Sequence, residues 1–172
     1  MNYATIKNCD IANGLGVRVS LFVSGCRHHC KNCFNEVAWN FQYGQKFTVE
    51  TENYLLSLLE SDYINGLSIL GGEPMEPENQ YPLLTFIKKI KEQYPQKDIW
   101  CYTGFTLEEL VGDSRANTEI IKDLLSYIDV LVDGKFIDAK KDITLKFRGS
   151  ANQRLIDIKK SAAEQRIVLF DD

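Results

Sequence analysis

The stretch VRVSLFVSGCRHHCKNC, residues 17–33, joins a run of branched and aromatic residues directly to three cysteines. The run alternates polar and apolar residues and then becomes almost continuously apolar, which is typical of a buried β-strand. It ends at Gly25, so Cys26, Cys30 and Cys33 lie in the loop that follows the strand. In proteins with a parallel sheet, active sites form at this end of the strands.

Strand-like and helix-like segments alternate along the rest of the chain. Apolar runs at 67–72, 98–104 and 128–134 predict three further strands. Helical spacing of apolar residues, or a helix-start signal, is found at 35–39, 51–61, 83–94, 106–109 and 120–125. We also expect an exposed strand at 143–149 and a hairpin between 153–160 and 165–170. This order predicts an α/β fold with a mostly parallel sheet.

Residues suited to chemistry follow each of the predicted strands. The cysteines follow the first strand, and Gly71, Gly72 and Glu73 follow the second. Residues 103–104, Thr-Gly, and residues 133–134, Asp-Gly, end the third and fourth. Because parallel strands end at the same edge of a sheet, we expect these four loops to meet at one site.

Length and composition indicate an ordinary globular protein. The chain has 172 residues, of which 44% are hydrophobic and 26% charged, and we expect a single domain over residues 1–172. It contains no apolar run long enough to span a bilayer and no signal-peptide core at its start, so we expect no membrane association and a cytoplasmic location. In that reducing compartment five cysteines favour a metal or catalytic site over disulfide bonds.

The cysteine spacing, Cys-x3-Cys-x2-Cys, leaves three interpretations open. A zinc ion normally takes four ligands, so His28, His29, Cys9 or Cys101 would have to complete the set. A 4Fe-4S cluster bound by three cysteines would keep one iron free for another molecule. The cysteines could also be reactive or incidental. Cys9 and Cys101 are most simply structural, since Cys101 lies within an apolar run.

Positive charge is concentrated near the C-terminus. The net charge of the chain is −4, yet residues 134–166 contain nine Lys or Arg against four Asp or Glu, a local charge of +5. Few aromatic residues are interleaved with these charges, so the segment does not favour nucleic-acid binding. A solvated face or a surface that meets an acidic protein partner explains it better.

The cysteine motif after a first strand, and Gly-Gly-Glu-Pro after a second, together resemble the radical S-adenosylmethionine (SAM) superfamily. The resemblance implies an incomplete (β/α) barrel, open on one side. It also implies that SAM binds the free iron of a 4Fe-4S cluster and is cleaved by an electron from it.

Four segments narrow this resemblance. The stretch DIANGLGVRVSLFVSGCRHHCKNCFN, residues 10–35, is similar to the start of glycyl-radical-enzyme activases. The segments DIWCYTGF (98–105), DVLVDGKF (129–136) and LKFRGSANQRLID (145–157) resemble activating proteins of anaerobic ribonucleoside-triphosphate reductases. Asn32 and Leu15 depart from residues common in the wider superfamily.

The resemblance assigns roles to particular residues. Cys26, Cys30 and Cys33 would bind the cluster. The residues expected at the SAM site are Asn32, Cys33, Phe34, Gly71, Gly72, Glu73, Thr103 and Asp133. No further catalytic residue is expected, because the cofactor supplies the radical chemistry.

The implied activity is the removal of hydrogen from a glycine of the reductase by a 5′-deoxyadenosyl radical. Flavodoxin or a similar donor would supply the electron. Alternatives are activation of pyruvate formate-lyase or another glycyl radical enzyme, a small-molecule radical SAM enzyme, and a zinc-binding module without catalysis. We expect the segment at about 134–166, which includes Arg148 and Arg154, to dock the partner.

Overall fold

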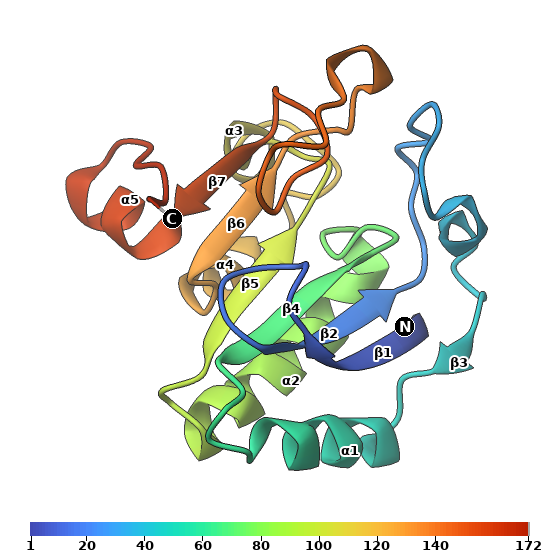
Figure 1. Ribbon diagram of the computed structural model, residues 1–172, viewed down its shortest axis with the longest axis vertical. Coiled ribbons are helices and arrows are strands. Elements are labelled where there is room, and N and C mark those ends of the chain that lie inside the picture. The colour runs from blue at the N-terminus through green and yellow to red at the C-terminus, as the bar shows by residue number, and fades with distance from the viewer. Residues whose placement is uncertain (172) are drawn as a thin grey trace.

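The computed structural model describes residues 1–171, which form a seven-stranded sheet with helices packed on one of its faces (Figure 1). The strands are β1 (Asn2–Asp10), β2 (Arg18–Val23), β3 (Gln45–Lys46), β4 (Gly66–Gly71), β5 (Asp98–Tyr102), β6 (Val130–Asp133) and β7 (Arg154–Asp157). The helices are α1 (Val49–Leu59), α2 (Pro77–Gln93), α3 (Leu107–Val111), α4 (Ile121–Ser126) and α5 (Ile158–Glu164), with short 3-10 helices at Glu36–Trp39 and Asp138–Lys140.

The sheet is parallel at its centre and antiparallel at both edges. Its strand order is β3-β1-β2-β4-β5-β6-β7. The pairs β2/β4, β4/β5 and β5/β6 are parallel, whereas β1 pairs antiparallel with β2 and β3, and β7 with β6. Val23 lies beside Gly71, and Tyr102 beside Val132, so the central strands end at nearly the same level. The predicted convergence of the loops that follow them is therefore confirmed.

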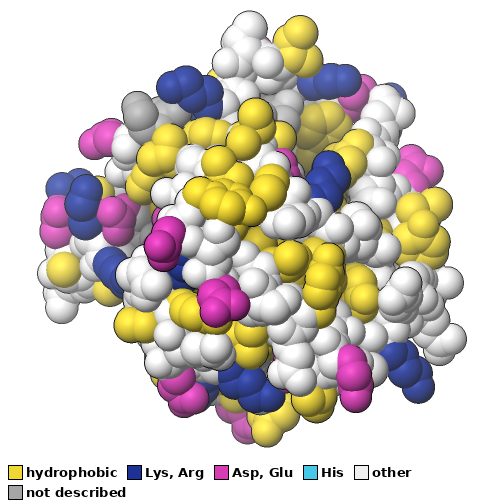
Figure 2. Space-filling model, turned by 60° about the horizontal axis from the view of Figure 1, so that its bottom comes forward, with side chains coloured by type: hydrophobic (Ala, Val, Ile, Leu, Met, Phe, Trp, Pro, Cys, Tyr) yellow, Lys and Arg dark blue, Asp and Glu magenta, His cyan; other side chains and the backbone are white. Residues whose placement is uncertain are grey.

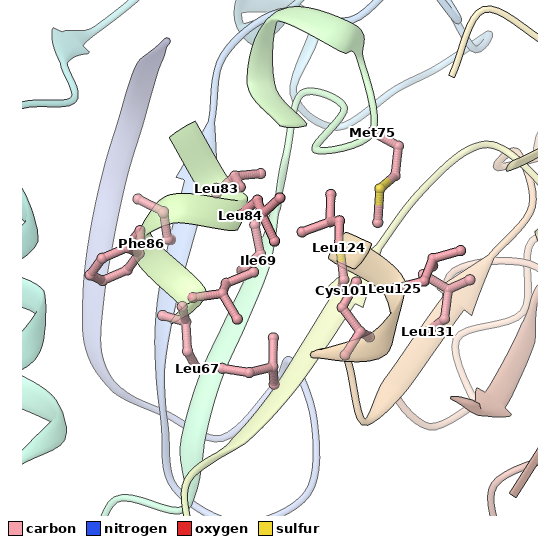
Figure 3. Packing of buried hydrophobic residues seen from close by; sticks show 14 of the residues in the cluster. Leu67, Ile69, Met75, Leu83, Leu84, Phe86, Cys101, Leu124, Leu125 and Leu131 are labelled. Atoms are coloured by element: carbon pink, nitrogen blue, oxygen red, sulfur yellow. The ribbon is translucent and has the colours of Figure 1, made fainter. Parts of the chain in front are cut away.

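Alternating side chains divide the central strands between two environments. One set joins apolar residues of α1, α2 and α4 in the main core, where Leu67, Ile69 and Cys101 are no more than 1% exposed (Figure 3). Cys101 faces α4 in this core, which confirms its predicted structural role. The other set, which includes Trp100, points to the face that the helices leave open. Loops cover that face, and Phe147 and Phe170 pack on the Trp100 ring.

Arg18 is fully buried on this second face. Its guanidinium donates to Ser68 Oγ at 2.7 Å and to the carbonyl of Leu67 at 3.0 Å, and it pairs with Asp98 Oδ1 at 2.6 Å. It also lies 5.3 Å from the centre of the Trp100 ring. These contacts make Arg18 part of the internal framework.

The predicted exposed strand at 143–149 is wrong. The segment consists of turns and bends, closed by an isolated bridge between Lys141 and Ser150. Ile143, Leu145 and Phe147 instead line a cavity, together with Arg148 and Gly149. These residues face the cavity without a neighbouring strand to pair with.

The predicted C-terminal hairpin is right in its pairing and wrong in its connection. Residues 168–170 lie beside β7, through hydrogen bonds from Asp157 N–H to Val168 O at 3.0 Å and from Phe170 N–H to Leu155 O at 2.9 Å. Between them the chain forms α5, because the Asp157 side chain caps its first turn by accepting from Lys160 N–H at 2.9 Å. Sequence analysis also missed β1 and β3, the antiparallel strands at one edge.

Ion pairs neutralise much of the basic C-terminal segment. Arg154, Lys159, Lys160 and Arg166 each pair with Asp or Glu, and several of these partners come from outside the segment. Figure 2, with the lower edge of Figure 1 turned forward, shows charges of both signs interspersed on that face and no histidine. The local charge of +5 therefore does not act as a set of free cations. No helix among residues 1–171 is long and apolar enough to cross a membrane.

Candidate functional site

A cavity of about 480 Å³ opens where the loops after β2, β4, β5 and β6 meet. Nine of the predicted site residues line it: Cys26, Cys30, Asn32, Cys33, Phe34, Gly71, Gly72, Glu73 and Thr103. Asp133 is not among the lining residues, although its neighbour Gly134 is. The structure therefore brings together all the predicted site residues except one.

The cysteine loop is held by its backbone. Gly25 N–H donates to Ala38 O at 2.8 Å, and Cys26 N–H donates to Trp39 O at 3.1 Å, so the short helix Glu36–Trp39 anchors the start of the loop. Within it, His29 and Asn32 have φ angles of +50° and +57°. This left-handed backbone turns the chain back on itself, and all three cysteines consequently face the same cavity.

Two thiols of this loop already accept backbone hydrogen bonds. His28 N–H lies 3.4 Å from Cys26 Sγ, and Asn35 N–H lies 3.4 Å from Cys33 Sγ. Hydrogen bonds to cysteine sulfur stabilise the thiolate and help to set the reduction potential of iron–sulfur clusters. This donor pattern suits sulfur atoms that carry negative charge when they bind a metal.

Without a bound cation, burial keeps the Cys26 and Cys30 thiols protonated at neutral pH. Burial raises the pKa of Cys26 to about 11, and burial together with the neighbouring Cys33 thiol raises the pKa of Cys30. Metal binding requires thiolates and releases their protons. The positive charge of the iron ions in a bound cluster would stabilise the negative charge of these buried thiolates.

The arrangement does not resemble a mononuclear zinc site. No three His, Cys, Asp or Glu side chains within residues 1–171 are placed to hold one metal ion. The expected fourth ligands are also engaged elsewhere: His28 bonds to Glu73, His29 packs against Trp39 at 4.4 Å, and Cys101 lies in the core. Cys9 is exposed, with its Sγ 3.7 Å from Tyr63 Oη. In a cluster each cysteine binds a different iron, so the fit of such a group rests on the shared cavity.

Glu73 connects the loops around the cavity. Its side chain is 1% exposed and accepts four hydrogen bonds. Oε1 accepts from Thr103 Oγ1 at 2.7 Å and from Met75 N–H at 2.8 Å. Oε2 accepts from Gly104 N–H at 2.7 Å and lies 2.8 Å from His28 Nε2. The carboxylate thus ties the cysteine loop to the end of β5, and protein donors already occupy its acceptor positions.

At Gly71 and Gly72, the backbone at the end of β4 packs directly against the backbone that supports the cysteine loop. Gly71 has a φ of +111°, which favours glycine, and Gly72 N–H donates to Val23 O at 2.7 Å. A Cβ at Gly72 would lie 2.6 Å from Gly25 O and 2.9 Å from Ala38 O, both in the backbone that supports the cysteine loop. Glycine at this position therefore keeps the two loops in contact.

We expect Gly72→Ala to lower the free energy of unfolding by about 1–3 kcal/mol, because the added methyl group would force rigid backbone apart. Urea unfolding of the cluster-free protein would measure this. Gly149→Ala at the same cavity is the control, since its Cβ would first meet the movable Phe136 ring at 3.2 Å. Equal losses in the two variants would contradict the argument.

Asp133 and Arg154 form a separate structural pair. Asp133 Oδ1 accepts from Arg154 Nε at 2.9 Å, and Oδ2 accepts from Leu107 N–H at 2.8 Å. Arg154 also binds Glu108 at 2.7 Å and 3.0 Å. Asp133 therefore fastens α3 and β7 to β6 and does not reach the cavity. Of the two arginines predicted to dock a partner, Arg154 is already committed to these carboxylates.

Sequence analysis missed several residues of the cavity. Tyr102 enters it from β5, and the segment 141–149 closes one side. The 3-10 helix Asp138–Lys140, which directly precedes this segment, is tied to the cysteine loop, because Asn32 Nδ2 donates to Asp138 Oδ2 at 2.9 Å. The alternation of apolar residues at 143, 145 and 147 is the available sequence signal, and the same alternation predicts a strand.

Comparisons with known proteins agree with a cluster site. Residues 12–156 match the family model described as a 4Fe-4S single cluster domain. An anaerobic ribonucleoside-triphosphate reductase-activating protein of Vibrio cholerae is 45% identical over 155 residues, which cover 89% of this chain and 96% of the relative. The protein of the same name from Enterobacteria phage T4 is 41% identical over 157 residues, 90% of this chain and 93% of the relative. That from Escherichia coli K12 is 42% identical over 155 residues, 89% of this chain and 96% of the relative.

Proposed function

The chain belongs to the family of anaerobic ribonucleoside-triphosphate reductase-activating proteins, and from this membership we propose that it generates a glycyl radical in an anaerobic ribonucleotide reductase. The observation that carries the proposal is the cavity in which three cysteines face Gly71 and Gly72 at the ends of parallel strands. When bound there, a 4Fe-4S cluster supplies the electron that cleaves SAM to methionine and a hydrogen-abstracting 5′-deoxyadenosyl group.

The chain's own residues would hold these groups. Cys26, Cys30 and Cys33 are the proposed cluster ligands, which leaves one iron open to SAM. Gly71 and Gly72, which line the cavity, are the proposed contact for the methionine end. The loop from Asn32 to Phe34 is the proposed contact for the adenine, and Phe34 is 82% exposed and so accessible to a ligand.

Glu73 and Thr103 would influence SAM binding indirectly, by holding the walls of the cavity in place. Their side chains bond to each other and to the surrounding loops, so they keep the cavity walls in place. Asp133 has no proposed contact with SAM, since it lies outside the lining of the cavity.

The wider assignments are also proposals. We propose that the sheet is the incomplete (β/α) barrel of radical SAM enzymes; helices cover only one of its faces, and the cavity lies at the ends of its parallel strands. The segment 134–166 would dock the reductase, because part of it closes one side of that cavity. Flavodoxin or a similar donor would supply the electron. Five unpaired cysteines support a reducing, cytoplasmic setting.

The test is anaerobic reconstitution with iron and sulfide, followed by reduction and incubation with SAM and the reductase. Electron paramagnetic resonance should then detect a glycyl radical that requires both SAM and the reductase. A radical that forms on pyruvate formate-lyase and not on the reductase would overturn the partner assignment. A colourless protein with stoichiometric zinc would overturn the cluster.

A further inference from the structure

The cavity has a second region on the open face of the sheet. Tyr102 enters it from β5, and Ala12 and Asn13 line it from the loop between β1 and β2. Tyr102 and Phe147 both pack against the buried cluster around Trp100 on that face, whereas Cys26, Cys30 and Cys33 lie in the loop after β2. The cavity therefore has a cysteine end and a region at Tyr102, which we call its floor.

The Tyr102 hydroxyl is buried and has no hydrogen-bond partner among residues 1–171. The two charged residues that act on this hydroxyl electrostatically, Arg18 and Asp10, are engaged elsewhere. Arg18 bonds to Ser68, Leu67 and Asp98, and Asp10 accepts from Ser20 Oγ at 2.7 Å and from Asn13 Nδ2 at 2.6 Å. A buried hydroxyl without a partner costs about 1–3 kcal/mol, so its position calls for a ligand atom.

Arg148 supplies a second unsatisfied donor in the same cavity. Its Nε is buried and has no partner in the described part of the chain, whereas its NH1 donates to Gln153 O at 3.2 Å. The preceding residue, Phe147, packs on Trp100 with ring centres 5.4 Å apart, which fixes this part of the segment over the open face of the sheet. Arg148 Nε–H and Tyr102 O–H are thus two donors without an acceptor.

The chemistry of this pair specifies its ligand. Both groups donate, so they match a carbonyl or carboxylate oxygen. The walls beside them, Leu70 and Phe147, are apolar. Among residues 1–171, His28 Nδ1 and Trp39 Nε1 at this cavity also have no partner, but both rings lie at the cysteine end, where His28 bonds to Glu73 and Trp39 packs against His29.

We propose that Tyr102 and Arg148 bind a main-chain carbonyl of the reductase segment that carries the reactive glycine. This inference rests on the proposed function. Glycine has no side chain, so an enzyme can position it only through its main chain and its neighbours. A carbonyl held at the floor would direct the glycine Cα–H towards the cysteine end, where that bond breaks, a C–H bond forms in 5′-deoxyadenosine, and the unpaired electron remains on Cα. Tyr102 and Arg148 are positioning residues for this transfer.

The test uses the reconstituted protein and a reductase whose glycines carry deuterium at Cα. Tyr102→Phe removes only the hydroxyl, and Arg148→Lys keeps the charge but removes Nε–H. We expect about a tenfold drop in the fraction of 5′-deoxyadenosine that carries deuterium, since one hydrogen bond contributes about 1.4 kcal/mol and each such step is tenfold in rate. SAM affinity and the reductase-free cleavage of SAM should remain at wild-type levels.

A second measurement does not depend on turnover. Both variants should bind a short fluorescent peptide centred on the reductase glycine more weakly than wild type, as measured by anisotropy. Tyr127→Phe, which alters a tyrosine beside Lys88, is the matched control. Unchanged deuterium transfer and peptide affinity overturn the inference, and an equal loss of SAM affinity reassigns the donors to SAM. A wild-type protein that transfers no deuterium and forms no glycyl radical overturns the proposed function itself.

Discussion

Glu73→Ala is expected to lower the free energy of unfolding by about 4 kcal/mol or more, because it leaves four buried donors without their acceptor. That is a large part of the stability of a typical domain, about 5–15 kcal/mol. Urea unfolding of the cluster-free protein should show the loss directly. Measuring without the cluster separates the role of Glu73 in the fold from any effect on iron.

Glu73→Gln and Glu60→Ala are the informative comparisons for this prediction. Glutamine keeps one acceptor oxygen but turns an NH2 group towards donors that need an acceptor, so we expect an intermediate loss. Glu60 is an exposed glutamate at the end of α1, and its replacement should change stability by less than about 0.5 kcal/mol. If Glu73→Ala unfolds like Glu60→Ala, the carboxylate does not hold the loops together.

In Glu73→Ala protein that remains folded, the cysteine loop should still bind the cluster less well. His28, between two of the proposed ligands, is fixed by Glu73 Oε2 and by its contact with Phe105, 4.5 Å between ring centres. Releasing this ring frees the loop between Cys26 and Cys30. We therefore expect reconstituted Glu73→Ala to retain less iron and sulfide per chain than wild type.

The central strands and the position of the site were predictable from the sequence because local signals agree there. The apolar run at 17–25 is stable as a strand only when it is buried. The glycines at 71 and 72 end the next strand at the point where two backbone segments come into contact. Because the parallel strands end at the same edge of the sheet, the loops that follow them meet there. Predicting this meeting point requires no knowledge of contacts between distant residues.

Local sequence signals say least where a residue's partner is remote in sequence. Asp133 is expected at the SAM site because it ends a strand, but its carboxylate pairs with Arg154, 21 positions later, and it is not in the cavity lining. The burial of Arg18 depends on Ser68 and Asp98, 50 and 80 positions later. Residues of the segment 143–149 line a cavity, and a period of two cannot distinguish a cavity from a neighbouring strand.

Arg154→Glu is expected to cost about 3–5 kcal/mol, since it leaves the buried Asp133 carboxylate unpaired and adds a like charge beside it. The side chain of Asp133 is 1% exposed, so water cannot replace the arginine. Urea unfolding is the measurement. Arg166→Glu, which reverses the charge of an exposed surface arginine, is the control and should cost far less. Similar losses in the two variants would show that the ion pair between Arg154 and Asp133 does not stabilise the fold more than a surface ion pair does.

The same guanidinium makes part of the stability depend on pH. Hydrogen bonds from Arg154 lower the pKa of Glu108 from its usual 4.5 to about 2. A lowered carboxyl pKa stabilises the fold above the unfolded value and loses that contribution as the pH falls. The Glu108 contribution is therefore complete above pH 4.5 and disappears towards pH 2. Glu108→Gln should consequently unfold more readily than wild type at pH 7, and the difference between them should shrink progressively between pH 4.5 and 2. A gap that stays constant across that range would mean that the charge of Glu108 does not contribute, and no gap at pH 7 would mean that Arg154 stabilises the fold through Asp133 alone.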